Sequence, residues 1–309
     1  MAATRPSRAG AAAVLVVLLV LAALALLRGR PTQPGPAIGD GCVVRGPGFA
    51  IPLSTDQGSI AADIAGVARH RSMPERAVTI AYAAALQESG LADLAYGDRD
   101  SVGVFQQRPS QGWGTRTQLL DPIYATTRFF AALAAVPRYS HLLVYQAAQD
   151  VQRSADGLAY DQYAPQGAAM ANGFTGYLPH AVWCWYGAGV KDRGRPAAAS
   201  RDLAAAFGPL PGSRLADPAR RPRAPSLLLR VPGQPAGWAV AAWVVTHAAA
   251  YGIKAVSFEG YRWTAVHGQL GWIRGSTRRH LAGRPHLAGR AHPDARAHPA
   301  APLLTVTFG

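Results

Sequence analysis

The residues best suited to chemistry lie in the stretch ALQESGLADLAYGDRDSVGVFQQRPSQGWGT, residues 85–115. Glu88 ends a run of small apolar residues with helical spacing, and Asp98, Arg99 and Asp100 follow in a turn-rich segment. At the C-terminal end of a helix, the helix dipole disfavours a negative charge, and burial among alanine and leucine disfavours it as well. Both effects raise the pKa of a carboxyl group, as a general acid near neutral pH requires. The alternative is a surface glutamate that ends a helix.

The elements around this stretch are expected to be helices with small apolar faces. Ser54 or Thr55 can cap one helix, and Pro74 opens the next helix at its first turn. In the second helix, small apolar residues recur at helical spacing up to Glu88, and Gly90 is a stop signal. We therefore expect Glu88 on the last turn of a helix.

The segment after Gly90 is rich in turns as far as residue 120, with a short strand or hairpin around residues 102–106. Helical patterns then return, and a short helix is expected to lead to Cys184. The expected longer helices cover residues 121–136, 141–151 and 161–173. These elements predict an α+β fold in which residues 54–187 form a mostly helical domain with a small β or loop insertion.

The N-terminus is typical of a targeting segment. Arginines flank an apolar run over residues 9–27, which is long enough to span a bilayer as a helix. We favour an uncleaved membrane anchor over residues 1–30, with the body of the protein outside the cytoplasm. Residues 31–53, rich in proline and glycine, are then expected to be a tether. Cleavage near residues 23–25, followed by secretion, is the alternative.

The composition changes in the C-terminal part. Residues 188–230 are rich in proline, arginine, alanine and glycine, which predicts a linker. Residues 231–309 combine an amphipathic helix with two strand patterns, which predicts a small αββ domain that would contact an unidentified protein partner. A low-complexity loop over about 278–301 places histidines six residues apart from His280 to His298. A metal-binding tract is one interpretation, but the neighbouring arginines disfavour a cation, so we predict neither a metal site nor a cofactor.

The formal net charge of +14 is unevenly distributed. Residues 56–187 hold 9 arginines and 11 acidic residues, a sum of −2, whereas residues 188–309 hold 17 basic and 5 acidic residues, a sum of +12. A nucleic-acid-binding domain is expected to carry a basic face, so we predict no nucleic-acid partner. The basic flanks are interpreted as solvated linkers, with attraction to an anionic membrane or cell-wall surface as the alternative.

The two cysteines precede and follow the main helical domain. Cys42 lies before the first helical pattern, and Cys184 lies at the end of the last one. In an oxidising compartment such a pair is more often a disulfide than two free thiols. The bond would close a loop of about 140 residues, which in the chain-entropy description stabilises a domain by several kcal/mol. Two cysteines alone do not make a metal site.

Several motifs, in this order, resemble the lysozyme-like superfamily, which includes the goose-type lysozymes and the soluble lytic transglycosylases. Glu88-Ser89 is similar to its catalytic Glu-Ser at a helix end, and Gly103-Val104-Phe105-Gln106 is similar to its Gly-Leu-Met-Gln. Tyr96-Gly97-Asp98-Arg99 resembles the Gly-Asp-Arg run of the goose-type group. More closely, residues 40–187 resemble exported or membrane-anchored bacterial proteins that carry a lysozyme-like domain and a small αββ C-terminal domain.

The resemblance implies cleavage of the β-1,4 bond between N-acetylmuramic acid and N-acetylglucosamine in the glycan strands of peptidoglycan. Glu88 would protonate the glycosidic oxygen and then, as a carboxylate, take a proton while the muramic 6-hydroxyl closes a 1,6-anhydro ring. Inverting hydrolysis would instead need a second carboxylate about 6.5–9.5 Å away, for which Asp98 and Asp100 are candidates. The alternative for both is a turn residue that caps backbone amides beside Arg99.

The resemblance also implies which residues bind the sugar. Gln106 would line the cleft, beside Ser89, and Gln149, with a longer side chain, stands where a later transglycosylase helix has an asparagine. Four aromatic side chains are candidates to stack on sugar rings, with the hydrophobic core as their alternative place: Tyr96, Phe105, Trp113 and Tyr145. Arg108 stands where the goose-type group has an aspartate, which weakens the prediction of hydrolysis. These departures keep open a domain that binds glycan without cleaving it.

Overall fold

The computed structural model describes residues 39–154, 157–187, 189–190, 193–216, 225–275 and 301–309. Helices and two antiparallel sheets are combined along these residues, so the fold is α+β, as predicted. The predicted anchor over residues 1–30 lies outside the described residues, and so does the His- and Arg-rich loop apart from Ala301. Across the described ranges, no helix has both the length and the apolar character that crossing a membrane requires.

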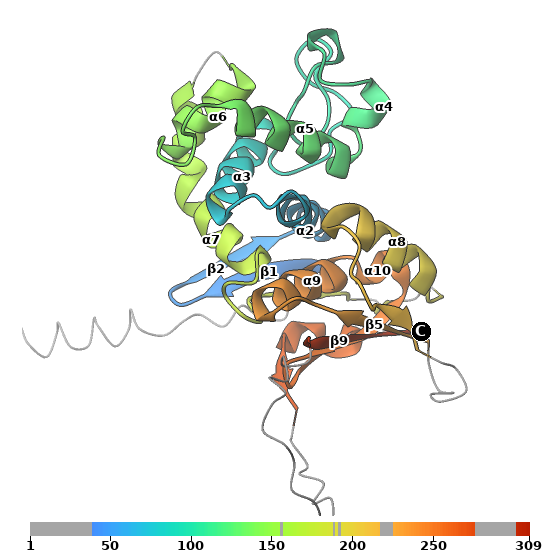
Figure 1. Cartoon of the computed structure of the whole chain (residues 1–309). Helices are drawn as coiled ribbons and strands as arrows, with labels where there is room; N and C mark the ends of the chain where they lie inside the picture. Colours follow the sequence, from blue (N-terminus) through green and yellow to red (C-terminus); the bar gives the residue numbers. More distant parts are fainter. Residues whose placement is uncertain (1–38, 155–156, 188, 191–192, 217–224, 276–300) are drawn as a thin grey trace, which may run out of the picture. The chain divides into compact units, whose positions relative to one another are not determined.

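Two helices form the centre of the helical part, α2 (Thr55–His70) and α3 (Glu75–Ser89) (Figure 1). Ser54 caps α2, because its side chain accepts a hydrogen bond from the backbone of Gln57 and the Gln57 side chain accepts one from Ser54. Gly90 ends α3 with a φ of 66°, a left-handed conformation that favours glycine. Both helix boundaries were expected from the sequence, and α3 ends where the sequence places Glu88.

The remaining helices of this part surround α3. They are α4 (Arg116–Leu119), α5 (Pro122–Ala135), α6 (Val144–Gln152) and α7 (Ala164–Phe174), together with the 3₁₀ segments η1 (Pro109–Gln111) and η2 (Gly157–Tyr163). α3 packs against α5, α6, η2 and α7, and its residues 77–86 are all buried. A Cβ on Gly167 of α7 would lie 2.9 Å from the carbonyl oxygen of Thr79, so glycine permits the close approach of these two helices. The hairpin expected around residues 102–106 is a single bridge between Val102 and Gln107.

The first sheet joins both ends of the helical part. Its strands β1 (Gly41–Gly46), β2 (Phe49–Leu53) and β3 (Val182–Trp185) lie in the order β2-β1-β3. Cys42 of β1 pairs directly with Cys184 of β3, and the two form a disulfide. The structure confirms the predicted disulfide.

Two expectations for this region are wrong. The tether expected over residues 31–53 contains the hairpin β1–β2, because Val43, Val44 and Leu53 are buried and the proline and glycine at 47–48 form its turn. The short helix expected before Cys184 is the strand β3, whose extended backbone is stabilised by pairing with β1.

The linker expected over residues 188–230 is also wrong in part. It contains the helix α8 (Pro196–Phe207) and the strands β4 (Arg214–Leu215) and β5 (Ser226–Arg230). The buried residues of α8 recur at helical spacing, and α8 packs against α2. The composition of residues 188–230 did not indicate this helix, because small residues and arginine are common both in linkers and in amphipathic helices.

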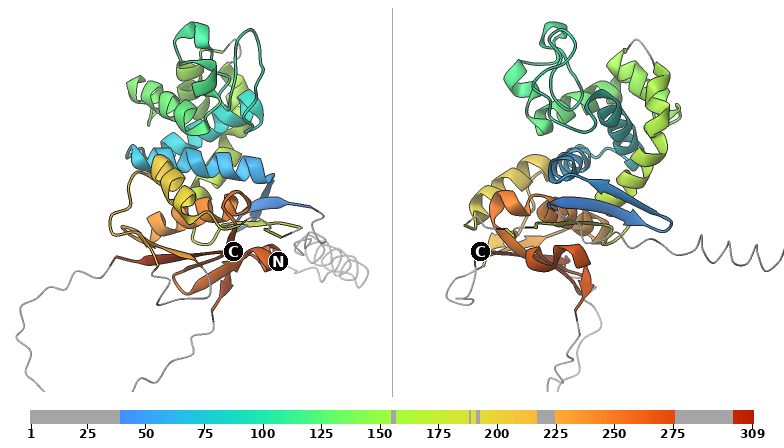
Figure 2. Two further views of the ribbon diagram at one scale, coloured as in Figure 1. Left: turned by 90° about the vertical axis from the view of Figure 1, so that its right-hand side faces the viewer. Right: turned by 180° about the vertical axis from the view of Figure 1, so that it is seen from behind.

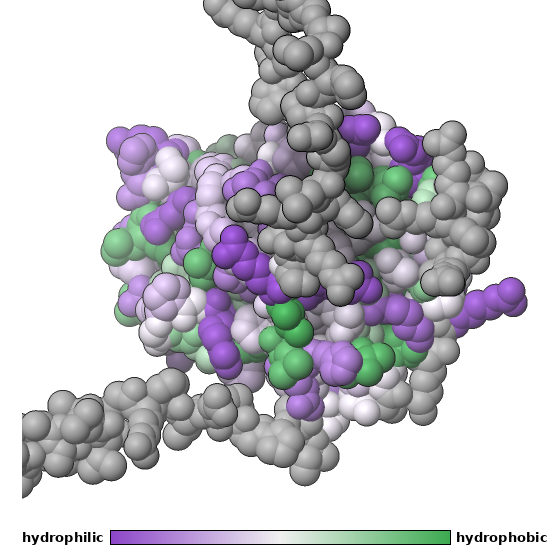
Figure 3. Space-filling view, turned by 90° about the horizontal axis from the view of Figure 1, so that it is seen from below, coloured by the Kyte–Doolittle hydropathy of each residue, from purple (hydrophilic) through white to green (hydrophobic). Residues whose placement is uncertain are grey.

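The C-terminal part is larger than the predicted αββ unit. After the helices α9 (Gln234–Thr246) and α10 (Ala248–Tyr251) come β6 (Ile253–Phe258), β7 (Tyr261–Thr264), the 3₁₀ segment η3 (Ala265–Leu270), β8 (Ile273–Arg274) and β9 (Leu303–Phe308). The sheet order β4-β5-β9-β6-β7-β8 shows that strands of the expected linker belong to the same sheet. α9 lies between α2 and this sheet (Figure 2). From below, hydrophobic side chains lie in separate patches among hydrophilic ones (Figure 3).

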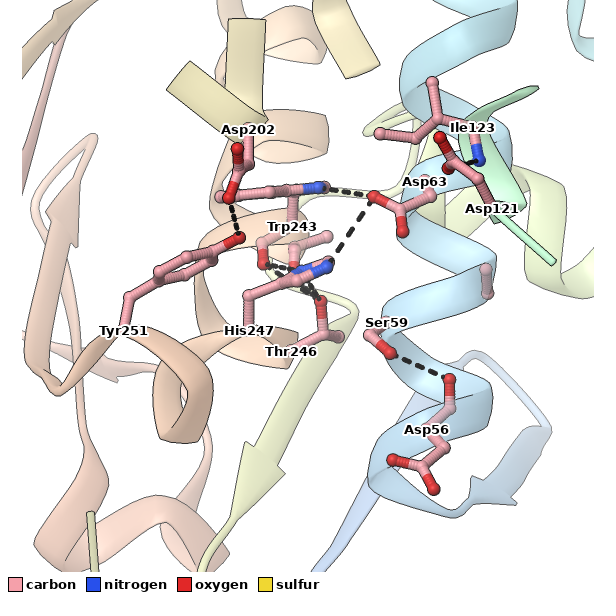
Figure 4. A network of polar contacts seen from close by, with 12 residues as sticks. Asp56, Ser59, Asp63, Asp121, Ile123, Asp202, Trp243, Thr246, His247 and Tyr251 are labelled. Carbon is pink, nitrogen blue, oxygen red and sulfur yellow. Dashed lines mark hydrogen bonds and ion pairs between the residues drawn. The ribbon is translucent and has the colours of Figure 1, made fainter. Parts of the chain in front are cut away.

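A buried polar network connects α2 to α9. The indole Nε1 of Trp243 donates to Oδ1 of Asp63 at 2.7 Å, and Nε2 of His247 lies 3.6 Å from the same oxygen (Figure 4). The ring of His247 stacks on that of Trp243 with centroids 4.1 Å apart. Next to this pair, the Tyr251 hydroxyl donates to Asp202 of α8 at 2.8 Å. These contacts make the helical and C-terminal parts share one core.

Candidate active site

Glu88 lies on the last turn of α3, half-buried where the helix leaves the core. The hydroxyl of Tyr160, a fully buried residue of η2, donates a hydrogen bond to Oε1 of Glu88 at 2.6 Å. Burial raises the pKa of Glu88, and hydrogen bonds from the Tyr160 and Gln152 side chains oppose that rise. The net result is the raised pKa expected of a general acid.

Gln152, at the end of α6, connects Glu88 to the loop that carries the second motif. Its amide Nε2 donates a hydrogen bond to the carbonyl oxygen of Phe105 at 2.7 Å. The Gln152 side chain also forms a hydrogen bond with the carboxylate of Glu88, which lowers the pKa of that group. The arrangement fixes the position of the loop relative to the acid. Gln152, rather than Gln149, is therefore the α6 glutamine next to Glu88.

Ser89 makes bonds within the protein. Its hydroxyl lies 2.8 Å from the carbonyl oxygen of Val104 and 3.1 Å from that of Ala85, and it accepts a hydrogen bond from the backbone of Ala92 at 3.0 Å. These contacts hold the end of α3 against the loop at 103–106. Ser89 thus positions Glu88 and the loop relative to each other.

The loop places Gln106 beside Tyr96. The amide Nε2 of Gln106 donates to the carbonyl oxygens of Tyr96 at 3.3 Å and Gly103 at 3.2 Å. A Cβ on Gly97 would lie 1.8 Å from Oε1 of Gln106, so glycine is required for this approach. The Tyr96 side chain is 73% exposed, which leaves its ring accessible for stacking.

The other aromatic candidates are placed differently. Phe105 is completely buried and stacks on Phe129 with centroids 4.5 Å apart, so it belongs to the core and does not face a sugar. Trp113 is half-buried and packs against the core. Tyr145 and Gln149 line a separate pocket of about 500 Å³ on α6, where Gln149 is bonded to Ser154.

The two aspartates of the turn have different surroundings. Asp98 is exposed, and its carboxylate lies 3.9 Å from the guanidinium of Arg99. Asp100 accepts hydrogen bonds from Nε of Arg108 at 2.8 Å and from the backbone of Ser110 at 2.7 Å. These bonds hold the pKa of Asp100 well below its usual range. Asp100 is therefore a turn residue, and its neutralising partner is Arg108 and not the expected Arg99.

Sequence reasoning missed Tyr160 and Gln152, which lie beside Glu88, and Asp93, which lies beside Gly103. Both Tyr160 and Gln152 are far from Glu88 in sequence; Gln152 lies three residues after Gln149, which stands at the position of the transglycosylase asparagine, and no local signal identifies Tyr160. Asp93 lies five residues after Glu88, and a Cβ on Gly103 would lie 3.5 Å from its Oδ1. Partial burial and the charge of Asp121 raise the pKa of Asp93 to about 6. The position of this aspartate shortly after the Glu-Ser motif was the sequence signal that could have identified Asp93.

The site is made of carboxyl, amide and hydroxyl groups. Across the described ranges, no group of three or more histidine, cysteine, aspartate or glutamate residues could hold a metal ion. The pockets of about 710 and 500 Å³ do not have Glu88 in their linings. The arrangement offers one half-buried acid, hydrogen-bond donors that can stabilise it as a carboxylate, and an exposed aromatic ring on the adjoining loop.

In comparisons with known proteins, no family model and no curated protein matches the chain.

Proposed function

We propose that the chain is a lytic transglycosylase-type enzyme that cleaves the β-1,4 bond between N-acetylmuramic acid and N-acetylglucosamine in peptidoglycan. The observation that carries the proposal is Glu88 itself: a half-buried carboxyl group with a raised pKa, hydrogen-bonded to Tyr160 at a helix end. The packing of the Glu-Ser and Gly-Val-Phe-Gln segments against each other supports it, because Ser89 bonds the carbonyl of Val104.

In the first step, protonated Glu88 donates its proton to the glycosidic oxygen as the bond to the muramic C1 breaks. The resulting carboxylate is stabilised by the Tyr160 hydroxyl and by Gln152. In the second step, the muramic 6-hydroxyl attacks C1 and its proton returns to Glu88. The 1,6-anhydro ring forms, no water is consumed, and the acid is regenerated.

The surroundings of the other carboxylates favour this route over hydrolysis. Inverting hydrolysis requires a second carboxylate that holds water about 6.5–9.5 Å from the acid. Asp100 is occupied by Arg108 and Ser110, and Asp98 is exposed beside Arg99. Asp93, with its raised pKa, is the carboxylate to test if the products prove to be hydrolytic.

The test is digestion of purified peptidoglycan by the chain and by a Glu88→Gln variant. We expect the variant to lose activity by about 100- to 10,000-fold, because general acid–base catalysis contributes this much. Glu75→Gln, the same change at the other end of α3, and Asp98→Asn should retain activity within about twofold, the range of substitutions away from a catalytic group. A fully active Glu88→Gln variant would contradict the proposal.

The second candidate function is glycan binding without cleavage. It is favoured by one observation: the exposed ring of Tyr96 can stack on a sugar without any acid–base step. Retention on peptidoglycan sacculi without any released fragment, for the wild-type chain and Glu88→Gln alike, would establish it.

We also propose that the body of the protein lies outside the cytoplasm, at the membrane or secreted. The Cys42–Cys184 disulfide supports this location, because such bonds persist in oxidising compartments. Thiol titration of the chain, isolated without reductant from its native location, should find no free thiol. Two free thiols per chain would contradict the proposed location.

A further inference from the structure

A cavity of about 710 Å³ lies between the helical part and the C-terminal part. Four connections converge on it: the turn between α2 and α3, the residues after α7, the residues after α8, and the turn between β5 and α9. Its volume falls in the range of about 300–1,000 Å³ that is typical of small-molecule pockets. The linings of such pockets usually combine apolar surface with a few polar groups.

The cavity is distinct from the candidate active site. Glu75, the first residue of α3, lines the cavity, and Glu88 lies on the last turn of the same helix. At about 1.5 Å per residue, the two positions are roughly 20 Å apart along the helix axis. A ligand in the cavity would therefore not contact the carboxyl group of Glu88.

The charged groups of the lining favour an anion. Arg69, on the last turn of α2, and Arg230, at the end of β5, both line the cavity and are exposed. Within the described part of the chain, neither guanidinium forms an ion pair. His70 adds a third basic side chain, and among the lining residues that the structure describes Glu75 is the one carboxylate. Burial raises the pKa of Glu75, so the surroundings of this carboxylate oppose its negative charge.

Although the Arg69 side chain is exposed, the protein atoms around its guanidinium also make it receptive to an anion. Desolvation lowers the pKa of its guanidinium, and the neighbouring Tyr177 opposes this effect. A carboxylate or phosphate beside Arg69 would stabilise the charge that burial disfavours, through charge-assisted hydrogen bonds of fork geometry.

The remaining lining is mainly apolar. Side chains from five elements or connections contribute to it: Met73, Val78, Phe207, Leu210 and Val231. Apolar surface of this kind binds alkyl groups through the hydrophobic effect. The lining therefore combines a hydrophobic wall with two guanidinium groups that form no ion pair with any residue in the described ranges.

We propose that this cavity binds a small amphiphilic anion, with its carboxylate or phosphate head toward Arg69 and Arg230 and its apolar chain against Met73 and Phe207. The proposal is independent of peptidoglycan cleavage. It predicts that both an anionic head and an apolar tail are needed for binding.

Isothermal titration calorimetry of the full chain with four eight-carbon probes tests this inference: octanoate, octyl phosphate, 1-octanol and octylammonium. We expect saturable binding of at least one anion, with a dissociation constant at least about tenfold below those of octanol and octylammonium. The two anions distinguish a carboxylate source from a phosphate source. Octanol binding as tightly as the anions, or no saturable binding of any probe, would overturn the proposal.

Matched substitutions locate the binding. Arg69→Gln and Arg230→Gln should each weaken binding of the preferred anion by about tenfold, because each removes a charge-assisted contact. Arg71→Gln removes the same charge two residues away, outside the lining, and should change the affinity less than about twofold. Equal losses in all three variants would refute a specific site. All three should still cleave peptidoglycan like the wild type, so the outcome for this cavity is separable from the outcome for Glu88.

Discussion

Glu88 and Asp63 are carboxylates that each accept a short hydrogen bond from one aromatic side chain. Tyr160 donates its hydroxyl to Glu88 at 2.6 Å, and Trp243 donates its indole N–H to Asp63 at 2.7 Å. Asp63 is only 9% exposed and has His247 as a second neighbour, in the core where α2 meets α9. Glu88 is half-buried at the end of a helix and adjoins the loop at 103–106.

The difference shows that burial and an aromatic donor do not by themselves indicate catalysis. The surroundings of Asp63 are closed by packed rings, so its hydrogen bonds stabilise the contact between two parts of the molecule. Glu88 keeps part of its surface exposed next to a loop with an accessible aromatic ring, Tyr96. Access for a reacting atom separates a candidate general acid from a structural acid.

Removing the hydrogen bond between Trp243 and Asp63 should produce the larger change in the free energy of unfolding. Trp243→Phe removes the indole donor from a buried carboxylate, and we expect the free energy of unfolding to fall by about 3 kcal/mol. Trp263→Phe is the matched control, because this equally buried indole donates to a neutral acceptor, the backbone carbonyl of Cys184, at 2.9 Å. Chemical denaturation measures both. Equal losses in the two variants would show that the charge of Asp63 has no special role.

Replacing Glu88 should raise the free energy of unfolding at neutral pH, whereas replacing Trp243 should lower it. Burial raises the pKa of Glu88 above its unfolded value, so the folded state binds more protons between the two pKa values. The contribution of Glu88 to stability is therefore largest below the unfolded pKa of about 4.3 and is lost as pH rises through the folded pKa. We expect Glu88→Gln to match the wild type at acidic pH and to be more stable at neutral pH.

Denaturation of both proteins across this pH range measures the difference. Asp98→Asn is the control for loss of one negative charge, because Asp98 is exposed. A Glu88→Gln variant that is equally destabilised at all pH values would contradict the desolvated carboxyl group inferred here.

The smallest expected effect concerns the hydrogen bond from Tyr160. This bond favours the charged form of Glu88, so Tyr160→Phe should raise the pKa of Glu88 further. The limb of kcat/KM that falls with rising pH, as the general acid loses its proton, should then move to higher pH. Tyr163→Phe, in the same 3₁₀ segment, is the control. An unchanged pH profile would show that Tyr160 does not act on the acid.

The sequence predicted the helical centre of the fold because its signals are local. A capping serine at Ser54, a proline before α3 and a glycine after it define both helices. The sheets were harder to predict, since β3 depends on a partner more than a hundred residues away and β5 pairs with β9. Strand pairing between distant segments leaves little trace in either segment alone.

For the candidate site, the sequence pointed to Glu88 as the candidate acid but not to its hydrogen-bond donors. Glu88, Ser89 and Gln106 belong to contiguous motifs, whereas Tyr160 reaches Glu88 from 72 positions away. Phe105 was a candidate for sugar stacking, yet it points into the core because the loop backbone is held by Ser89 and Gln152. Neither the direction of a loop side chain nor a distant donor can be predicted from spacing.

The central claim is that Glu88 acts as acid and then base without a second carboxylate. Mass spectrometry of the products from digested peptidoglycan tests this most directly. The account predicts fragments that end in 1,6-anhydro-N-acetylmuramic acid and that disappear with Glu88→Gln. Fragments with a reducing N-acetylmuramic acid, formed by addition of water, would contradict it.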